Sequence, residues 1–237
     1  MGLLDFLIGG EDSQLRRHSK RLANLNAQHE DRNSSARWLA EKGTDDAILG
    51  LFGRFSITTE SQMKDAAEKE LVVDLLYDLG PKVVGPARDW LKRNSNIAQP
   101  LRIIEHFEGR DAVVDLLVEL IGRENDPFKT EKKRQLLIKL TELRSPRCVP
   151  AVVPILRDFD EGVRYAAVEV LLATEDPAAT AALAEALANP DEDSNRVRGR
   201  IAEGFNLRRL SLGEHAEAVA KRPPNGWVVV GDTLQKG

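Results

Sequence analysis

Apolar residues recur every three to four positions along most of this chain, which is the spacing of amphipathic helices. The pattern is clearest over residues 145–173. There, one apolar stripe over 149–156 and a second over 163–171 are separated by the acidic turn 158–162. Neither helix can bury its stripe alone. The pattern therefore predicts a two-helix unit that stacks against neighbouring units.

Prolines mark the first helix of this unit. Pro146 suits the first turn of a helix, where its missing N–H costs nothing. Pro150 and Pro154 lie inside the helix and predict that it bends. The turn that follows supplies turn formers and a candidate N-cap for the second helix.

Diverged copies of the unit recur along the chain. Successive first helices are predicted to begin 36, 30, 35 and 31 residues apart, within the range of helical arrays, at Asp45, Pro81, Asp111, Pro146 and Pro177. In this register one apolar position is occupied by Ile48, Val84, Val114 and Val149. In the last copy the same position holds the polar Thr180. A second is occupied by Phe55, Leu91, Ile121, Leu156 and Leu187. The chain is therefore predicted to be an all-α repeat protein.

The turn and helix start at 160–167, Asp-Glu-Gly-Val-Arg-Tyr-Ala-Ala, resemble the corresponding part of HEAT repeats. The resemblance is specific over 146–172, weaker over 177–210, and limited to the apolar pattern upstream. It implies a right-handed α-α superhelix, a solenoid of about five to six HEAT-like helix pairs, used mostly to hold partners. It also implies a structural ladder, in which an arginine pairs with a turn acid, formed by Asp160, Arg164, Asp191 and Arg198.

Three segments are predicted: an apolar N-terminal tip over 1–10, the repeat array over 11–222, and a C-terminal tail over 223–237. Residues 11–31 have a helical pattern, and a short helix is predicted over 36–41. The tip either covers the first repeat or docks to a partner or a membrane surface, through Leu3, Leu4, Phe6 and Leu7. Residues 227–230 resemble a single strand, expected to lie across the last repeat or in a disordered tail.

Composition narrows the class of protein. A net charge of −4 does not direct the chain to nucleic acid, and an aromatic content of 5% favours packed small-residue helices over a β-sandwich. Cys148 is the sole cysteine, so an internal disulfide is excluded and a reducing compartment is favoured. The chain has no apolar run long enough to span a bilayer and no secretory signal, so we expect it in the cytoplasm.

Catalytic patterns are missing from the sequence. The four histidines have no metal-ligand spacing, and the chain lacks a CxxC pair, a phosphate-binding glycine loop and a nucleophile elbow. We expect no cofactor, no metal and no enzymatic activity. Enzymes among HEAT-like proteins keep two alternatives open: a nucleic-acid-binding or base-processing protein, like the alkylpurine glycosylases, and a bilin lyase-like protein. Trp90 is expected in the core, whereas Trp38 could face either way.

The predicted second helices, which the resemblance places on the inner face, carry many basic residues in the later repeats. Those not used by the ladder are Lys132, Lys133, Lys139, Arg196, Arg200 and Arg208. A row of bases on a concave wall would attract an acidic ligand. The leading prediction is therefore a non-enzymatic scaffold or adaptor that binds a protein partner with an acidic segment along its concave face.

Overall fold

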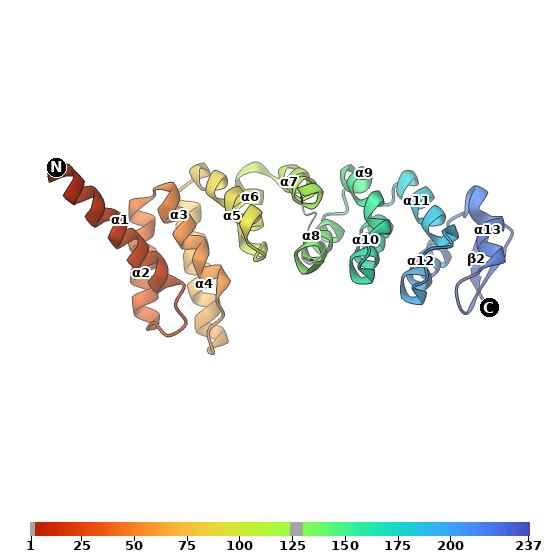
Figure 1. Cartoon of the computed structure of the whole chain (residues 1–237), viewed down its shortest axis with the longest axis horizontal. Coiled ribbons are helices and arrows are strands. Elements are labelled where there is room, and N and C mark those ends of the chain that lie inside the picture. The colour runs from red at the N-terminus through yellow and green to blue at the C-terminus, as the bar shows by residue number, and fades with distance from the viewer. Residues whose placement is uncertain (1–2, 124–129) are drawn as a thin grey trace. The chain divides into compact units, whose positions relative to one another are not determined.

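The computed structural model describes residues 3–123 and 130–237, with side chains from residue 10 onward. The chain forms two compact units, Met1–Val113 and Val114–Gly237, and each is built from helices that pack in two layers (Figure 1). The all-α repeat fold predicted from the apolar pattern is confirmed.

The regular elements of the first unit are α-helices and short 3₁₀ helices. Its elements are α1 (Leu3–Leu22), α2 (His29–Lys42), α3 (Asp45–Phe52), η1 (Gly53–Ser56), α4 (Gln62–Asp78), η2 (Pro81–Val83), α5 (Val84–Arg93) and α6 (Ala98–Glu108). Helix α4 packs against α2 and α6, and α3 packs against α1 and α5. Within the helix pairs, α2 contacts α3 and α5 contacts α6. Helix α7 (Arg110–Arg123) begins in this unit and continues into the second.

The second unit repeats the same arrangement. Its elements are the rest of α7, then α8 (Thr130–Leu143), η3 (Pro146–Cys148), α9 (Val149–Val152), η4 (Val153–Arg157), α10 (Glu161–Thr174), α11 (Pro177–Ala188), α12 (Asn195–Arg208), η5 (Gly213–His215), α13 (Ala216–Lys221), β1 (Trp227–Val230) and β2 (Thr233–Lys236). Helix α10 packs between α8 and α12 (Figure 1). The short helix η4 contacts α10 and α11.

The repeat register predicted from the sequence is confirmed by burial. The predicted first-helix starts fall at or within one residue of the starts of α3, η2, α7, η3 and α11. Every apolar residue assigned to the two repeated positions is at most 8% exposed. Thr180, which breaks one position, is half-buried, and the neighbouring Ala179 is 1% exposed in its place.

Local sequence fixes where several helices begin. Asp160 Oδ1 accepts a hydrogen bond from the Val163 N–H at 2.9 Å, and Ser194 Oγ accepts one from Val197 at 3.1 Å. These side chains satisfy backbone donors that the first turn of a helix leaves unpaired. The sequence predicts that the prolines of the central unit bend its first helix. They do more than that and divide it into η3, the four-residue α9, and η4.

The helices predicted near the N-terminus were wrong in detail. Residues 11–31 are not one helix, because the chain turns at 23–28 and α2 begins at His29 rather than near residue 36. At the turn, Asn24 Oδ1 accepts a hydrogen bond from the Asn26 N–H, a local bond that competes with helix. The side chains of Leu3, Leu4, Phe6 and Leu7 lie outside the described residues.

The tail also forms a sheet that the sequence analysis did not expect. Strands β1 and β2 pair antiparallel, with Val230 opposite Thr233, across the two-residue turn Gly231-Asp232. Gly231 has φ +65°, and a glycine adopts this backbone conformation without steric cost. Strand β2 packs on α12 and Leu234 is 2% exposed, so the hairpin covers the last helix pair.

Candidate interaction site

Arg164 joins two successive repeats of the second unit. Its Nε and Nη2 bind the two carboxylate oxygens of Glu192 at 2.7 and 3.1 Å. Nη1 donates to the carbonyls of Asp158 and Phe159 at 3.0 and 3.1 Å. The Glu192 hydrogen bond raises the pKa of Arg164, despite the opposing effect of burial. One guanidinium thus holds the turn before α10 to the turn before α12.

The same position recurs in the neighbouring helices. Arg164 is the fourth residue of α10, and Lys133 and Arg198 are the fourth residues of α8 and α12. Lys133 Nζ binds Asp158 Oδ2 at 2.7 Å, in the turn of the next repeat. Arg198 donates instead to the carbonyls of Leu187 and Arg222. For Arg198, a backbone carbonyl just after α13 thus takes the place of the turn acid that Arg164 and Lys133 reach.

The structural ladder therefore exists with different acids. Asp160 caps α10 and does not accept from Arg164. Asp191 is exposed, and Arg198 binds carbonyls rather than its carboxylate. Burial, together with the charge of Arg222, lowers the pKa of Arg198. In both turns the acid that is reached lies two residues before the N-cap of the next helix: Asp158 precedes Asp160, and Glu192 precedes Ser194.

The six bases predicted to bind a partner are mostly engaged within the protein. Lys133 belongs to the ladder, and Lys132 is only 8% exposed. Arg200 binds Glu169 through Nε at 2.5 Å and Nη2 at 3.1 Å, while Arg208 Nη1 donates to the Leu172 carbonyl at 2.6 Å. The remaining pairs are Lys139 with Glu142 at 2.8 Å and Arg196 with Glu161 at 3.4 Å.

The exposed side of the second helices is therefore a set of ion pairs and not a row of unpaired bases. Arg196 also lies over the ring of Tyr165, with its Cζ 4.0 Å from the ring centroid. An acidic ligand would have to displace these internal partners to reach the bases. Binding of a partner by these six residues stays a prediction.

A related cluster in the first unit was missed by the sequence analysis. Arg32, the fourth residue of α2, binds both oxygens of Glu68 at 2.7 and 2.8 Å, and Arg54 binds Glu68 Oε2 at 2.8 Å. His29 Nδ1 lies 2.5 Å from Glu68 Oε1, and Arg54 also binds Asp65 at 2.7 Å. The signal available in the sequence was a basic residue at the fourth position of a second helix.

Burial and hydrogen bonding act in opposite directions on these carboxylates. Burial raises the pKa of Glu68, but hydrogen bonds from Arg32, His29 and Arg54 lower it to about 2. Burial likewise opposes ionisation of Asp65, while Lys69 and Arg54 hold its pKa well below its usual range. Glu68 is 1% exposed and Arg54 is fully buried. The cluster fixes α2, η1 and α4 together, which is a structural task.

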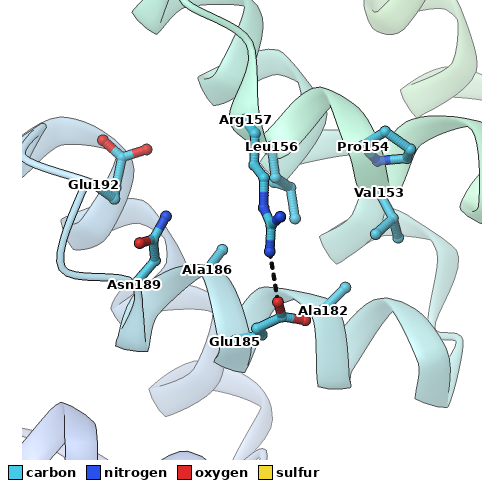
Figure 2. A pocket seen from close by; sticks show the side chains of 9 residues that line it. All are labelled: Val153, Pro154, Leu156, Arg157, Ala182, Glu185, Ala186, Asn189 and Glu192. Atoms are coloured by element: carbon cyan, nitrogen blue, oxygen red, sulfur yellow. Dashed lines mark hydrogen bonds and ion pairs between the residues drawn. The ribbon is translucent and has the colours of Figure 1, made fainter.

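An open groove lies between η4 and α11 in the second unit. Its apolar chamber, of about 340 Å³, is lined by Val153, Pro154, Leu156, Arg157, Ala182, Glu185, Ala186, Asn189 and Glu192 (Figure 2). Figure 2 shows Arg157 reaching across the groove to Glu185, and their ion pair is 2.8 Å long. Both side chains of this pair are largely exposed, at 73% and 57%.

A second chamber continues the groove toward the inter-helix turns. It has a volume of about 290 Å³ and is lined by Leu156, Arg157, Asp158, Arg164, Asn189, Asp191, Glu192 and Asp193. The two chambers share four lining residues, so they form one channel with an apolar end and an acidic end. We call it the η4–α11 groove. The ladder pair Arg164–Glu192 forms part of its wall.

Other groups that sequence analysis singled out have structural surroundings. Burial raises the pKa of the Cys148 thiol to about 11, so this cysteine is protonated at neutral pH. Trp90 packs on Phe52, with ring centroids 5.9 Å apart, and Trp38 stacks on His18 at 4.3 Å. In the part of the chain that the structure describes, no three His, Cys, Asp or Glu residues gather to hold a metal ion. Across those same residues, no helix combines the length and apolar character needed to cross a membrane.

A comparison with protein-family models identifies the repeats of the second unit. Residues 114–205 match the family model of HEAT repeats, and this range contains the ladder residues and the η4–α11 groove. No curated protein matches the sequence. Two crystal structures, each titled as an engineered protein, resemble the chain. One is 18% identical with a TM-score of 0.38, over 79% of this chain and 97% of the other. The second is 17% identical with a TM-score of 0.41, over 88% of this chain and 63% of the other. HEAT repeats are thus identified over residues 114–205 of this all-α helical repeat chain.

Proposed function

We propose that this protein is a non-enzymatic cytoplasmic scaffold that holds a segment of a partner protein in the η4–α11 groove. The observation that carries the proposal is the groove itself: an open channel whose apolar chamber has a volume of about 340 Å³, inside the HEAT repeats. That volume lies within the range of pockets that take up ligand groups. HEAT repeats generally mediate protein interactions, which supports a protein as the occupant.

Rigid walls suit the groove to this function. Leu156 and Ala186 belong to different helix pairs, and the Arg164–Glu192 bonds hold those two pairs in register. The Lys133–Asp158 bond holds the pair of Leu156 to the preceding helix α8. A groove fixed before binding loses little conformational entropy when a partner enters, so more of the contact energy appears as affinity. The apolar wall residues supply the favourable burial, at about 25 cal/mol for each Å² removed from water.

The second-helix face is a weaker site for the partner in this proposal. Its bases are engaged by acids of the same or adjacent repeats, such as Glu161 and Glu169, so an acidic partner would exchange one ion pair for another. Such an exchange yields little net free energy at a solvent-exposed surface. The apolar chamber requires no such exchange.

A substitution that fills the groove tests the proposal. Ala186 lines the apolar chamber, and Ala186→Phe would occupy the space that a partner side chain needs. The control is Ala181→Phe, on the same helix at an exposed position that does not line the groove. The assay is affinity capture from the native cell extract with quantitative mass spectrometry, using wild type and both variants at equal concentration.

We expect proteins captured by wild type and Ala181→Phe to be lost with Ala186→Phe, while circular dichroism of the three proteins stays the same. Equal capture by all three would refute binding in this groove. Wild-type binding to single- or double-stranded DNA with a steep salt dependence would favour the nucleic-acid alternative instead.

A further inference from the structure

We infer that the η4–α11 groove selects a partner segment in which an apolar side chain lies next to lysine or arginine. The inference rests on the proposed function and adds the chemistry of the partner. It reverses the charge expected from the sequence, which predicted an acidic partner for a basic row. The reason lies in how charges are distributed around the two chambers of the groove.

Five acids and two bases line the groove. The acids are Asp158, Glu185, Asp191, Glu192 and Asp193, and the bases are Arg157 and Arg164. Three of the acids have charged partners, since Asp158 binds Lys133, Glu185 binds Arg157, and Glu192 binds Arg164. The lining therefore keeps an excess of negative charge after its internal ion pairs are counted.

The excess is concentrated in the acidic chamber. Asp191 and Asp193 are exposed there, and neither carboxylate forms an ion pair with any residue that the structure describes. Arg222 reaches the same loop, but its guanidinium donates to the carbonyls of Pro190 and Glu192. Asp193 also attracts Arg164, but that guanidinium is already bound to Glu192, so both carboxylates remain without an ion pair of their own at this end of the groove.

This arrangement suits a ligand with two kinds of side chain. An aliphatic or aromatic group would enter the chamber between Val153 and Ala186, which lies beside the acidic end. A neighbouring ammonium or guanidinium group would then lie near Asp191 and Asp193 in the second chamber, or near Glu185 in the first. The exposed Arg157–Glu185 pair can open at little cost, because solvent-exposed ion pairs contribute about 1 kcal/mol or less.

An acidic segment would be disfavoured at the same place. Its carboxylates would face Asp191 and Asp193, while the bases of the lining are already held by other acids. Charge complementarity of this kind selects partners and speeds association more than it adds affinity. The binding of a basic segment should therefore weaken as salt rises, because exposed charges are screened.

The test uses a displayed library of randomised dodecapeptides selected on the full chain. Parallel selections use wild type, the groove-filling Ala186→Phe, and the double variant Asp191→Asn/Asp193→Asn. A charge-matched control, Glu175→Gln/Glu214→Gln, removes two exposed carboxylates of the same unit that do not line the groove. Affinities of the recovered peptides are then measured by fluorescence anisotropy at low and high salt.

We expect wild type and the charge-matched control to enrich peptides with lysine or arginine beside an apolar residue. The Asp191→Asn/Asp193→Asn protein should lose this charge preference and bind the same peptides roughly three- to tenfold more weakly at low salt. Ala186→Phe should not enrich them.

The outcomes separate the inference from the proposed function. If peptides lost with Ala186→Phe are neutral or acidic, or are unaffected by Asp191→Asn/Asp193→Asn, the groove binds proteins but the charge inference is wrong. If Ala186→Phe enriches the same peptides as wild type, or if wild type enriches none, both the proposed function at this groove and the inference fail.

Discussion

The contact that most directly joins the groove to the repeat fold is the pair Arg164–Glu192, and its removal gives a quantitative test. Arg164→Ala deletes a guanidinium that makes two bonds to Glu192 and two to backbone carbonyls of the preceding turn. The side chains of Arg164 and Glu192 are only 15% and 5% exposed. The substitution therefore leaves a buried carboxylate without its cation.

The cost follows from this geometry. Hydrogen bonds to charged groups contribute about 1.5–3 kcal/mol, and loss of one partner of a buried ion pair costs about 3–5 kcal/mol. Glu192 keeps a hydrogen bond from the Ser194 N–H at 3.0 Å, and Arg164 is not fully buried. We therefore expect Arg164→Ala to lower the free energy of unfolding by about 2–3 kcal/mol, a large share of the about 5–15 kcal/mol typical of a domain.

Arg157 supplies a matched control in the same groove. Its ion pair with Glu185 has a similar length, 2.8 Å, but is largely exposed. Arg157→Ala should change the free energy of unfolding by less than about 1 kcal/mol, because solvent screens the pair and its ordering costs entropy. The two variants remove the same type of side chain, so their difference measures the effect of burial.

The assay is urea unfolding of the full chain followed by far-ultraviolet circular dichroism. A cycle of Arg164→Ala, Glu192→Gln and the double variant gives the coupling, expected at about 1–2 kcal/mol. Since repeat arrays can unfold in stages, amide hydrogen exchange should show the loss in α10 and α12. An unfolding midpoint for Arg164→Ala no lower than that of Arg157→Ala would contradict the ladder.

Three further predictions concern other parts of the fold. The lowered pKa of Glu68 means that its stabilising effect is present above about pH 4.5 and lost as the pH falls toward about 2, so Glu68→Gln should flatten acid unfolding in that window, as monitored by hydrogen exchange of α2 and α4. Leu234→Ala should cost about 2–4 kcal/mol and increase exchange in α12, because Leu234 is buried where the hairpin packs; an unchanged unfolding midpoint would show that the hairpin does not stabilise the array. Lys133→Glu should destabilise by about 2 kcal/mol or more by placing a carboxylate against Asp158, whereas Lys139→Glu, at an exposed pair, should change the unfolding midpoint little; equal effects would place Lys133 outside the ladder.

The apolar pattern by itself determined the helix-pair architecture. Leu156 and Leu187 lie one repeat apart, and both are buried as the pattern predicts. This succeeds because a helix buries one stripe at its own 3.6-residue period, so the positions that face the core can be read from the chain alone. The starts of α11 and α10 could also be read from the sequence, because Pro177 and the N-cap Asp160 act on backbone groups close to them in the chain.

The hairpin shows where local information was present but not used. Gly231-Asp232 is a two-residue turn of the kind that joins antiparallel strands, and a second short strand follows it at Thr233. The apolar run at 227–230 was the stronger signal, and the polar second strand has only Leu234 to mark its buried face.

Partners of charged side chains were decided only by tertiary structure. Nothing in the sequence around Arg164 and Lys133 distinguishes them from basic residues that lie in solvent. Each nevertheless reaches an acid 25 to 28 residues away, in the turn of the next repeat. Which acid is reached depends on how that turn is folded: Glu192 is buried against Arg164, while Asp191 and Asp193 are exposed. A charge interacts with whatever lies within a few ångströms, and helix stacking sets those distances. The sequence shows how many bases the second helices carry. Only the stacked repeats show that acids already bind most of these bases and that the η4–α11 groove has an acidic end.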